Sequence, residues 1–264
     1  MNDVLVICYH ALSPTWRSEL SLTPDSFEYQ VRHLLDRGWH ATTFAAAALE
    51  PPAARTLAIT FDDAFASVKL YAAPVLARLG VPATIFAPTA FLDGGPLAWP
   101  GLDRWQNTPD AGELTAMTWE DLRELAGAGW EIGSHTRTHP RLTQVSGPDL
   151  ERELGGSREE CTRELGVECR SIAYPYGDVD ARVADAARQL GYSAGAALSS
   201  RLERLGPYRH PRVAIYHEDP AWRFRLKAAR PVRDLRASRL WPLRSPAPPD
   251  SSDAEATVSG ARES

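Results

Sequence analysis

Cysteine is scarce in this chain, and long apolar runs are missing from it. Three cysteines occur in 264 residues, an odd number without a Cys-x-x-Cys pair. We therefore expect neither a disulfide framework nor a thiolate zinc site, and such thiols fit a reducing compartment. No stretch approaches the roughly 18 apolar residues of a transmembrane helix, and the start MNDVLVICYH lacks the basic segment of a signal peptide. The sequence predicts a cytoplasmic protein without a transmembrane segment.

An excess of basic charge is also absent. The chain carries 29 Lys and Arg against 34 Asp and Glu, a net charge of -5. Nucleic-acid binding proteins usually show a basic footprint, so we expect no nucleic-acid partner. Hydrophobic residues make up 44% and charged residues 24%, which is typical of a globular protein with a sizeable core.

Short apolar runs alternate with amphipathic helical patterns along the chain. Seven runs have the length and flanks of strands: 4–9, 56–61, 83–87, 131–134, 171–174, 193–197 and 213–216. Alternation of this kind implies parallel strands joined by crossover helices. About seven such units favour a distorted or incomplete α/β barrel over an open sheet.

Two regions stand apart from this alternation. Residues 92–118 form a long connection rich in Gly, Pro and Trp, and connections of that length often serve as lids or binding loops. Its Trp99 and Trp105 either stack on a bound ligand or cover the barrel end as core. Residues 231–264 are polar and rich in Pro, Ser and Ala, and we predict a disordered tail. The predicted domain therefore covers 1–230.

The first motif of chemical interest is Thr60-Phe61-Asp62-Asp63, at the end of an apolar run. Adjacent carboxylates are unfavourable unless a cation or a shared proton relieves them. Successive strand residues point to opposite sides, so two functional carboxylates imply that the strand has already turned into its loop. The alternative is an ordinary pair of loop acids.

The second motif contains His135 and His139, directly after the run Trp-Glu-Ile. Two histidines four residues apart can face the same way over one helical turn and chelate a metal. With one Asp they would form the set of two His and one carboxylate that leaves coordination positions open. Thr136 excludes a zincin His-Glu-x-x-His site. The alternative is a pair of surface histidines around a turn.

The third motif is Tyr174-Pro175-Tyr176-Gly177, which again follows a strand. Pro restricts φ and Gly permits a tight turn, so this loop can direct a backbone N–H into a site. By itself the motif is equally an ordinary strand-to-helix turn. All three motifs fall at carboxyl ends of strands, where α/β folds gather their chemistry.

With these motifs in this order, the sequence resembles the polysaccharide deacetylase family, which shares the NodB homology domain and includes carbohydrate esterase family 4. The resemblance covers about residues 4–220 and rests on TFDD, SHTRTHP and YPYG. Smaller family-like features are Tyr9-His10, Pro82-Ala83-Thr84 and His210-Pro211-Arg212-Val213. The resemblance implies a distorted (β/α)7 barrel in a single domain.

The resemblance also implies roles for individual residues. Asp62 would be the general base, and Tyr176 would offer its backbone N–H to the oxyanion. A divalent metal, usually Zn2+ with Co2+, Mn2+, Ni2+ or Fe2+ as alternatives, would bind to Asp63, His135 and His139. We place Tyr174, Pro175, Trp99 and Trp105 among the substrate-binding residues.

Three positions depart from the family pattern. Ala64 stands where a Gly is common, which is tolerable if φ is negative there. Ala173 stands where many relatives have an Arg that orients the catalytic Asp, and we hypothesise that Arg212 takes this role. A late Leu-x-x-His motif for the general acid is missing. The candidates for the acid are His10, which we favour, His210 and His217.

The function that follows is removal of N-acetyl groups from amino sugars of a polysaccharide or glycan precursor. A second hypothesis keeps the site and changes the substrate to a formyl group or a cyclic ureide. A third is a carbohydrate-binding relative that has lost turnover, which Ala173 and the missing late His favour. The complete set of Asp62, Asp63, His135 and His139 argues against that loss.

Overall fold

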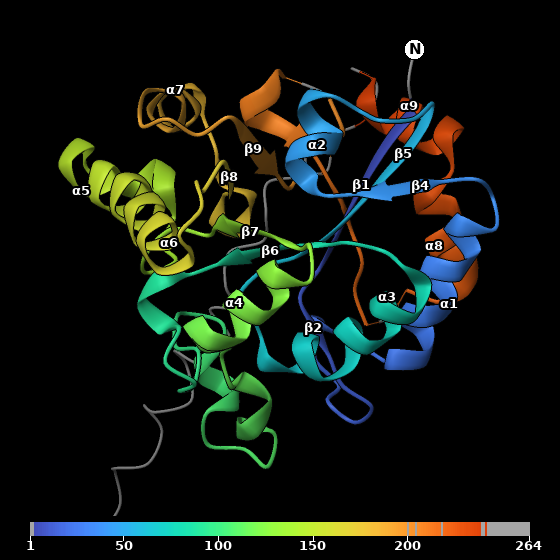
Figure 1. Ribbon diagram of the computed structural model, residues 1–264, viewed down its shortest axis with the longest axis horizontal. Coiled ribbons are helices and arrows are strands. Elements are labelled where there is room, and N and C mark those ends of the chain that lie inside the picture. The colour runs from blue at the N-terminus through green and yellow to red at the C-terminus, as the bar shows by residue number, and fades with distance from the viewer. Residues whose placement is uncertain (1–2, 200, 204, 218, 239–240, 242–264) are drawn as a thin grey trace, which may run out of the picture.

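Parallel strands form a nearly closed barrel at the centre of the protein (Figure 1). The computed structural model describes residues 3–199, 201–203, 205–217, 219–238 and 241. The strand order is β10-β9-β8-β7-β6-β5-β1-β11, and every neighbouring pair is parallel. Because β10 and β11 are consecutive pieces of chain at opposite ends of this order, the segment around Arg212 brings the two edges together. The predicted distorted (β/α)7 barrel is confirmed.

Each of the seven predicted apolar runs contains a strand. The barrel strands are β1 (Asp3–Tyr9), β5 (Arg55–Phe61), β6 (Thr84–Ala87), β7 (Glu131–Ser134), β8 (Ser171–Ala173), β9 (Ala194–Ala197), β10 (His210–Pro211) and β11 (Val213–Ala214). The apolar pattern missed β10 and three further short strands, β2 (Ala11–Leu12), β3 (Ser21–Leu22) and β4 (His40–Thr42). β4 pairs with β5, and β2 pairs with β3.

Helices surround the barrel, with α5, α6 and α7 on one side in Figure 1 and α1, α3 and α8 on the other. Their bounds are α1 (Pro24–Leu35), α2 (Phe44–Leu49), α3 (Ala73–Leu79), α4 (Trp119–Gly127), α5 (Gly147–Glu151), α6 (Ser157–Leu165), α7 (Ala181–Gln189), α8 (Ala221–Ala228) and α9 (Arg230–Ala237). Side chains cap the starts of several helices. Thr118 and Asp121 form a capping box, and the Asp180 side chain accepts from the Val183 N–H.

Alternation along the strands decides what faces the barrel interior. Small residues such as Ala58, Ala173 and Ala194 face inward around Phe86, and Phe44 of α2 contacts the Phe86 ring edge-on at 5.4 Å. Little space remains inside, since a Cβ at Gly133 would lie 2.7 Å from the Phe86 ring. The interior is therefore a packed core, and a site can form only beyond the strand ends.

The predicted tail is wrong at its start, because residues 230–237 form helix α9. Pro231 lies in the first turn, where its missing N–H costs nothing. Arg233 fastens the helix to β1 by an ion pair of 2.6 Å with Asp3, and its guanidinium also stacks over Trp39. The polar composition gave no sign of these long-range contacts. Within the rest of the predicted tail, residues 239–240 and 242–264 lie outside the described residues. In the described part of the chain, no helix has the length and apolar character needed to cross a membrane.

Candidate metal centre and catalytic site

Asp63, His135 and His139 meet at the carboxyl end of the barrel, as the motifs predicted. Their candidate ligand atoms all lie within 4.8 Å of one another, and all three residues are buried. Each histidine Nε2 lies 3.3 Å from Asp63 Oδ1. One carboxylate and two imidazoles thus converge on a single point from two different loops.

A left-handed turn after β5 explains how two adjacent aspartates serve one site. Asp62 continues the inward series of Ala58 and Thr60, whereas Asp63 has a φ of 70°. This conformation keeps the second carboxylate from turning to the opposite side, in agreement with the strand turning into its loop. Ala64 also has a positive φ, 55°, so the condition under which alanine would be easily tolerated there, a negative φ, is not met. An alanine in this conformation stores strain of about 1–2 kcal/mol.

The second motif is an irregular loop, and the expectation of a helical turn between its histidines is wrong. Thr136 and His139 have φ values of 68° and 61°. Side chains hold the loop in shape, since the Thr136 hydroxyl accepts from the His139 N–H at 3.0 Å. Glu153 accepts from the backbone N–H groups of Arg137 and Thr138, both at 2.9 Å. Nothing in the sequence pointed to Glu153, because it lies in a separate helical segment.

A hydrogen bond to the backbone fixes the orientation of the His135 ring. Its Nδ1 lies 2.8 Å from the Ala173 carbonyl oxygen. A carbonyl can only accept, so Nδ1 carries a proton and Nε2 is the nitrogen that faces Asp63. The His139 ring is held between aromatic rings, stacked on Trp99 at 4.1 Å and edge-on to Tyr176 at 4.7 Å.

The residues of this cluster fit a divalent metal. Within the described part of the chain, buried Asp63 Oδ1 and His139 Nδ1 have no hydrogen-bond partner. Burial disfavours the Asp63 carboxylate, but His135 and His139 outweigh it and hold the pKa of Asp63 below its usual range. Two ring nitrogens and a carboxylate oxygen this close together need either a proton or a cation between them. A set of nitrogen and oxygen ligands suits zinc and its first-row neighbours.

Arg212 pairs with Asp62 across 150 residues of sequence. Its two terminal nitrogens donate to the two Asp62 oxygens at 2.6 and 2.7 Å, and one also reaches the Thr60 hydroxyl at 3.1 Å. Burial disfavours ionised Asp62, but the guanidinium outweighs it and lowers the pKa of the carboxyl. Arg212 therefore keeps Asp62 charged in a buried place, which is the arrangement that our hypothesis for Arg212 requires.

His10 is the general-acid candidate that the structure brings to Asp62. Cys8, His10 and Asp62 have side-chain atoms within 4.8 Å of one another, and the Cys8 thiol donates to Asp62 at 3.4 Å. We assign no metal to this group because both Asp62 oxygens bind the Arg212 guanidinium. His210 lies instead against Phe44, the ring that closes the other end of the barrel.

The four predicted substrate-binding residues have different surroundings. Trp99 is 6% exposed and covers His139. Pro175 is buried in the turn that carries Tyr176. The Tyr174 side chain is wholly buried and donates to the Tyr208 carbonyl at 2.8 Å, so its assignment to substrate contact is corrected to packing. Trp105 lies edge-on against Trp16 at 5.4 Å, as part of the core edge.

The third motif brings Tyr176 to the mouth of the cluster. Tyr176 has a φ of 59°, its ring touches His139, and Arg141 stacks on the ring at 4.4 Å. Gly177 is required, because a Cβ there would overlap the Leu198 carbonyl. Arg141 follows the second motif directly, but a lone arginine in a loop carries no signal of such a contact.

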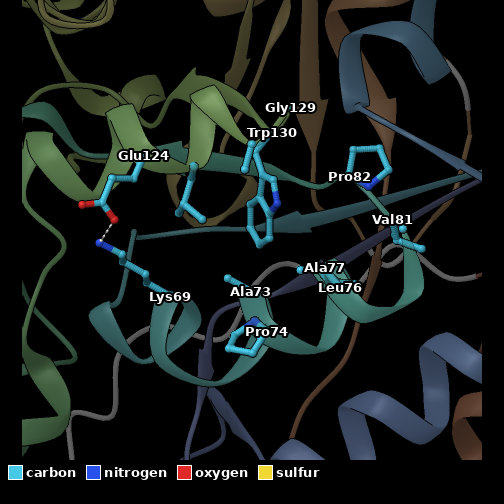
Figure 2. A pocket seen from close by; sticks show the side chains of 13 residues that line it. Lys69, Ala73, Pro74, Leu76, Ala77, Val81, Pro82, Glu124, Gly129 and Trp130 are labelled. Carbon is cyan, nitrogen blue, oxygen red and sulfur yellow. Dashed lines mark ion pairs between the residues drawn. The ribbon is translucent and has the colours of Figure 1, made fainter.

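A groove outside the barrel has no part in this cluster. It measures about 680 Å³ and lies between α3 and α4, where Trp130 and Pro82 line it (Figure 2). Lys69 closes one end through a 2.5 Å ion pair with Glu124. None of its lining residues belongs to the three motifs.

Comparisons with known proteins agree with the fold and the motifs. A model of the polysaccharide deacetylase family matches residues 50–195, which is more than half of the chain. The Bacillus subtilis protein YxkH, named as a polysaccharide deacetylase, is 26% identical over 195 residues, 72% of this chain and 62% of that protein. The chain thus spans less than two thirds of that relative's length. It belongs to the polysaccharide deacetylase family.

Two solved structures share the fold. A deacetylase from Streptococcus pyogenes, solved with acetate, has a TM-score of 0.71 and 20% identity over 86% of this chain and 98% of that one. A polysaccharide deacetylase from Bacillus cereus has a TM-score of 0.71 and 23% identity over 86% of this chain and 69% of that one. At such identities the likeness establishes the barrel, and the chemistry must be argued from the site.

Proposed function

We propose that this protein is a metal-dependent hydrolase that removes N-acetyl groups from amino sugars of a polysaccharide or glycan precursor. The observation that carries the proposal is that an ion pair and a group of candidate metal ligands lie next to each other at the carboxyl end of β5. The buried Asp62–Arg212 ion pair directly adjoins the cluster of Asp63, His135 and His139. Membership of the polysaccharide deacetylase family supports the substrate class.

The metal would be held by Asp63, His135 and His139. When bound, zinc or a similar ion supplies a Lewis acid for the acetamide carbonyl and lowers the pKa of a coordinated water. Neutral imidazoles leave most of the positive charge on the ion, which this chemistry needs. Trp99 covers the His139 face and keeps bulk water from that side of the cluster.

Asp62 is the base in this scheme. It is ionised because Arg212 compensates its charge, and it receives the proton of the attacking water. Fixing both oxygens in a fork geometry orients the carboxylate before the reaction begins. The Tyr176 N–H would stabilise the developing oxyanion, and losing one such donor typically costs about 3 kcal/mol.

His10 would donate a proton to the departing amine, which leaves only as a neutral group. A leaving-group series tests this role. In His10→Gln, release from an ordinary acetamide should fall about 100-fold or more, whereas release from an activated anilide or ester should fall far less. His217→Gln is the control. Equal losses on both substrates, or the larger acetamide loss in His217→Gln, would remove His10 from the acid role.

Metal analysis and acetate release together test the proposed function. We expect the purified protein to hold about one divalent ion and to release acetate from N-acetylated chito-oligosaccharides. A chelator should abolish release, and added zinc should restore it. Release of formate, or opening of a cyclic ureide, would transfer the site to the second hypothesis. Bound metal without turnover of any acylated sugar would favour the carbohydrate-binding relative.

A further inference from the structure

The outer surface of α8 combines exposed aromatic and apolar side chains with arginines. We call the group Tyr29, Trp222, Arg223, Arg225 and Leu226 the α8 patch. Trp222 is 60% exposed, Leu226 46% and Tyr29, from neighbouring α1, 36%. Single exposed apolar residues are ordinary on a protein surface, but three that lie together on adjoining helices need an explanation.

The arginines of the α8 patch lie over its rings. The Arg223 guanidinium is 5.7 Å from the Trp222 ring, and that of Arg225 is 5.7 Å from the Tyr29 ring. Arg225 also donates to the Tyr29 hydroxyl, a neutral partner, at 2.8 Å. On the other side of the helix, buried Phe224 packs against His33 of α1. The helix is therefore anchored by one face and presents rings with cations on the other.

Charge around the α8 patch contrasts with that of the whole protein. Residues 221–237 contain six basic residues and one acidic residue, although the complete chain has a net charge of -5. Asp219, next to the helix start, pairs with Lys227 at 2.5 Å and more loosely with Arg223 at 3.8 Å, whereas Arg225 contacts the neutral Tyr29 hydroxyl. Exposed aromatic rings within a locally basic surface are typical of segments that lie on anionic membranes.

The α8 patch belongs to the catalytic end of the barrel at its Trp222 side. β11 runs parallel to β1, and β1 runs parallel to β5, which ends at the two aspartates. The chain leaves β11 at that same end and then enters α8 at Ala221. An external surface that contacts Trp222 would therefore lie near the end of the barrel where the proposed substrate enters.

We propose that the α8 patch docks the protein onto an anionic lipid surface, with Trp222 and Leu226 in the interface and the arginines against the head groups. Docking of this kind is peripheral and needs no membrane-spanning helix. It presents the catalytic end to sugars carried at a membrane. The docking is independent of the proposed hydrolysis, and its test measures binding alone.

Vesicle co-sedimentation tests the docking. The full chain should sediment with phosphatidylcholine vesicles that contain about 30 mol% phosphatidylglycerol and remain in solution with pure phosphatidylcholine. Arg223→Glu/Arg225→Glu should weaken binding to the anionic vesicles by about 10-fold or more. The control Arg152→Glu/Arg188→Glu makes the same change in net charge on exposed sites of the α5–α7 side and should bind like the parent protein.

A second pair of variants separates the apolar part. Trp222→Ser should weaken vesicle binding, whereas Leu70→Ser, at a residue 64% exposed elsewhere, should not. All four variants should retain the thermal stability of the parent protein. Absence of sedimentation, or equal losses in patch and control variants, would overturn the proposal. A dimer in solution that Trp222→Ser converts to a monomer would assign the surface to a second copy of the chain and overturn it as well.

Discussion

The two ends of the barrel are built from the same strands. They differ in backbone strain and in whether their buried polar groups have hydrogen-bond partners. Within the described part of the chain, five non-glycine residues have a positive φ, and all lie in the motif loops at the carboxyl end: Asp63, Ala64, Thr136, His139 and Tyr176. At the amino end, Glu131 accepts from the Ala45 N–H and from the hydroxyls of Thr84 and Ser171.

This difference suggests that the amino end of the barrel contributes mainly to stability, whereas the carboxyl end holds the candidate site. The amino end is closed by Phe44 and by a satisfied carboxylate, so it resembles ordinary protein interior. The carboxyl end keeps orphan atoms on Asp63 and His139 together with strained backbone. Strain and unsatisfied polar groups persist where surrounding structure imposes them, and they cluster at functional sites. Substitutions at the two ends should accordingly affect different measurements.

The largest effect is expected for Asp62→Asn at the carboxyl end. Loss of the proposed base should lower acetate release by on the order of 100- to 10,000-fold while the metal content stays unchanged. The matched carboxylate-to-amide change at the amino end, Glu131→Gln, should leave turnover of the folded enzyme unchanged. Comparable losses of activity in the two variants would contradict the division between the ends.

Arg212→Met should affect both stability and pH dependence, because Arg212 enters the carboxyl end from the interior. Leaving Asp62 buried without its partner should cost about 3–5 kcal/mol in the free energy of unfolding. Arg212 lowers the pKa of Asp62, so its removal raises that pKa and moves the acid limb of kcat/KM to higher pH. A variant with the parent's pH profile would reduce Arg212 to a structural role, and Arg212→Lys should restore part of the shift.

Phe44→Ala should destabilise the packing at the amino end of the barrel and leave the candidate site unchanged. Removal of this buried ring leaves a cavity beside Phe86, and the expected loss is about 3–5 kcal/mol of unfolding free energy. Denaturant unfolding measures the loss, and metal affinity at low temperature should be unchanged. A large fall in metal affinity of the folded variant would show that the two ends are coupled.

The smallest effect is expected for Ala64→Gly. Because Ala64 has a φ of 55°, glycine should relieve strain and raise the free energy of unfolding by about 1 kcal/mol. The control Ala66→Gly, in the helical stretch just beyond, should lower it by about 0.5–1 kcal/mol. If both changes destabilise the protein equally, the turn after Asp62 carries no stored strain.

Local patterns predicted the barrel well and the loops less well. The seven apolar runs became strands because apolar alternation and length are properties of short segments. The irregular path from His135 to His139 was not predicted, since side-chain bonds from Thr136 and Glu153 decide it. Helix α9 was missed because its main anchor, Asp3, lies at the far end of the sequence.

The sequence by itself determined seven of the barrel strands, the three motifs and the identity of the metal-ligand candidates, because each depends on neighbours in the chain. Tertiary structure decided which distant groups meet. Closure of the barrel puts β11 beside β1 and so carries Arg212 to Asp62, and it places His10 there while His210 faces Phe44. Such pairings depend on how the sheet closes, and no local pattern contains that information.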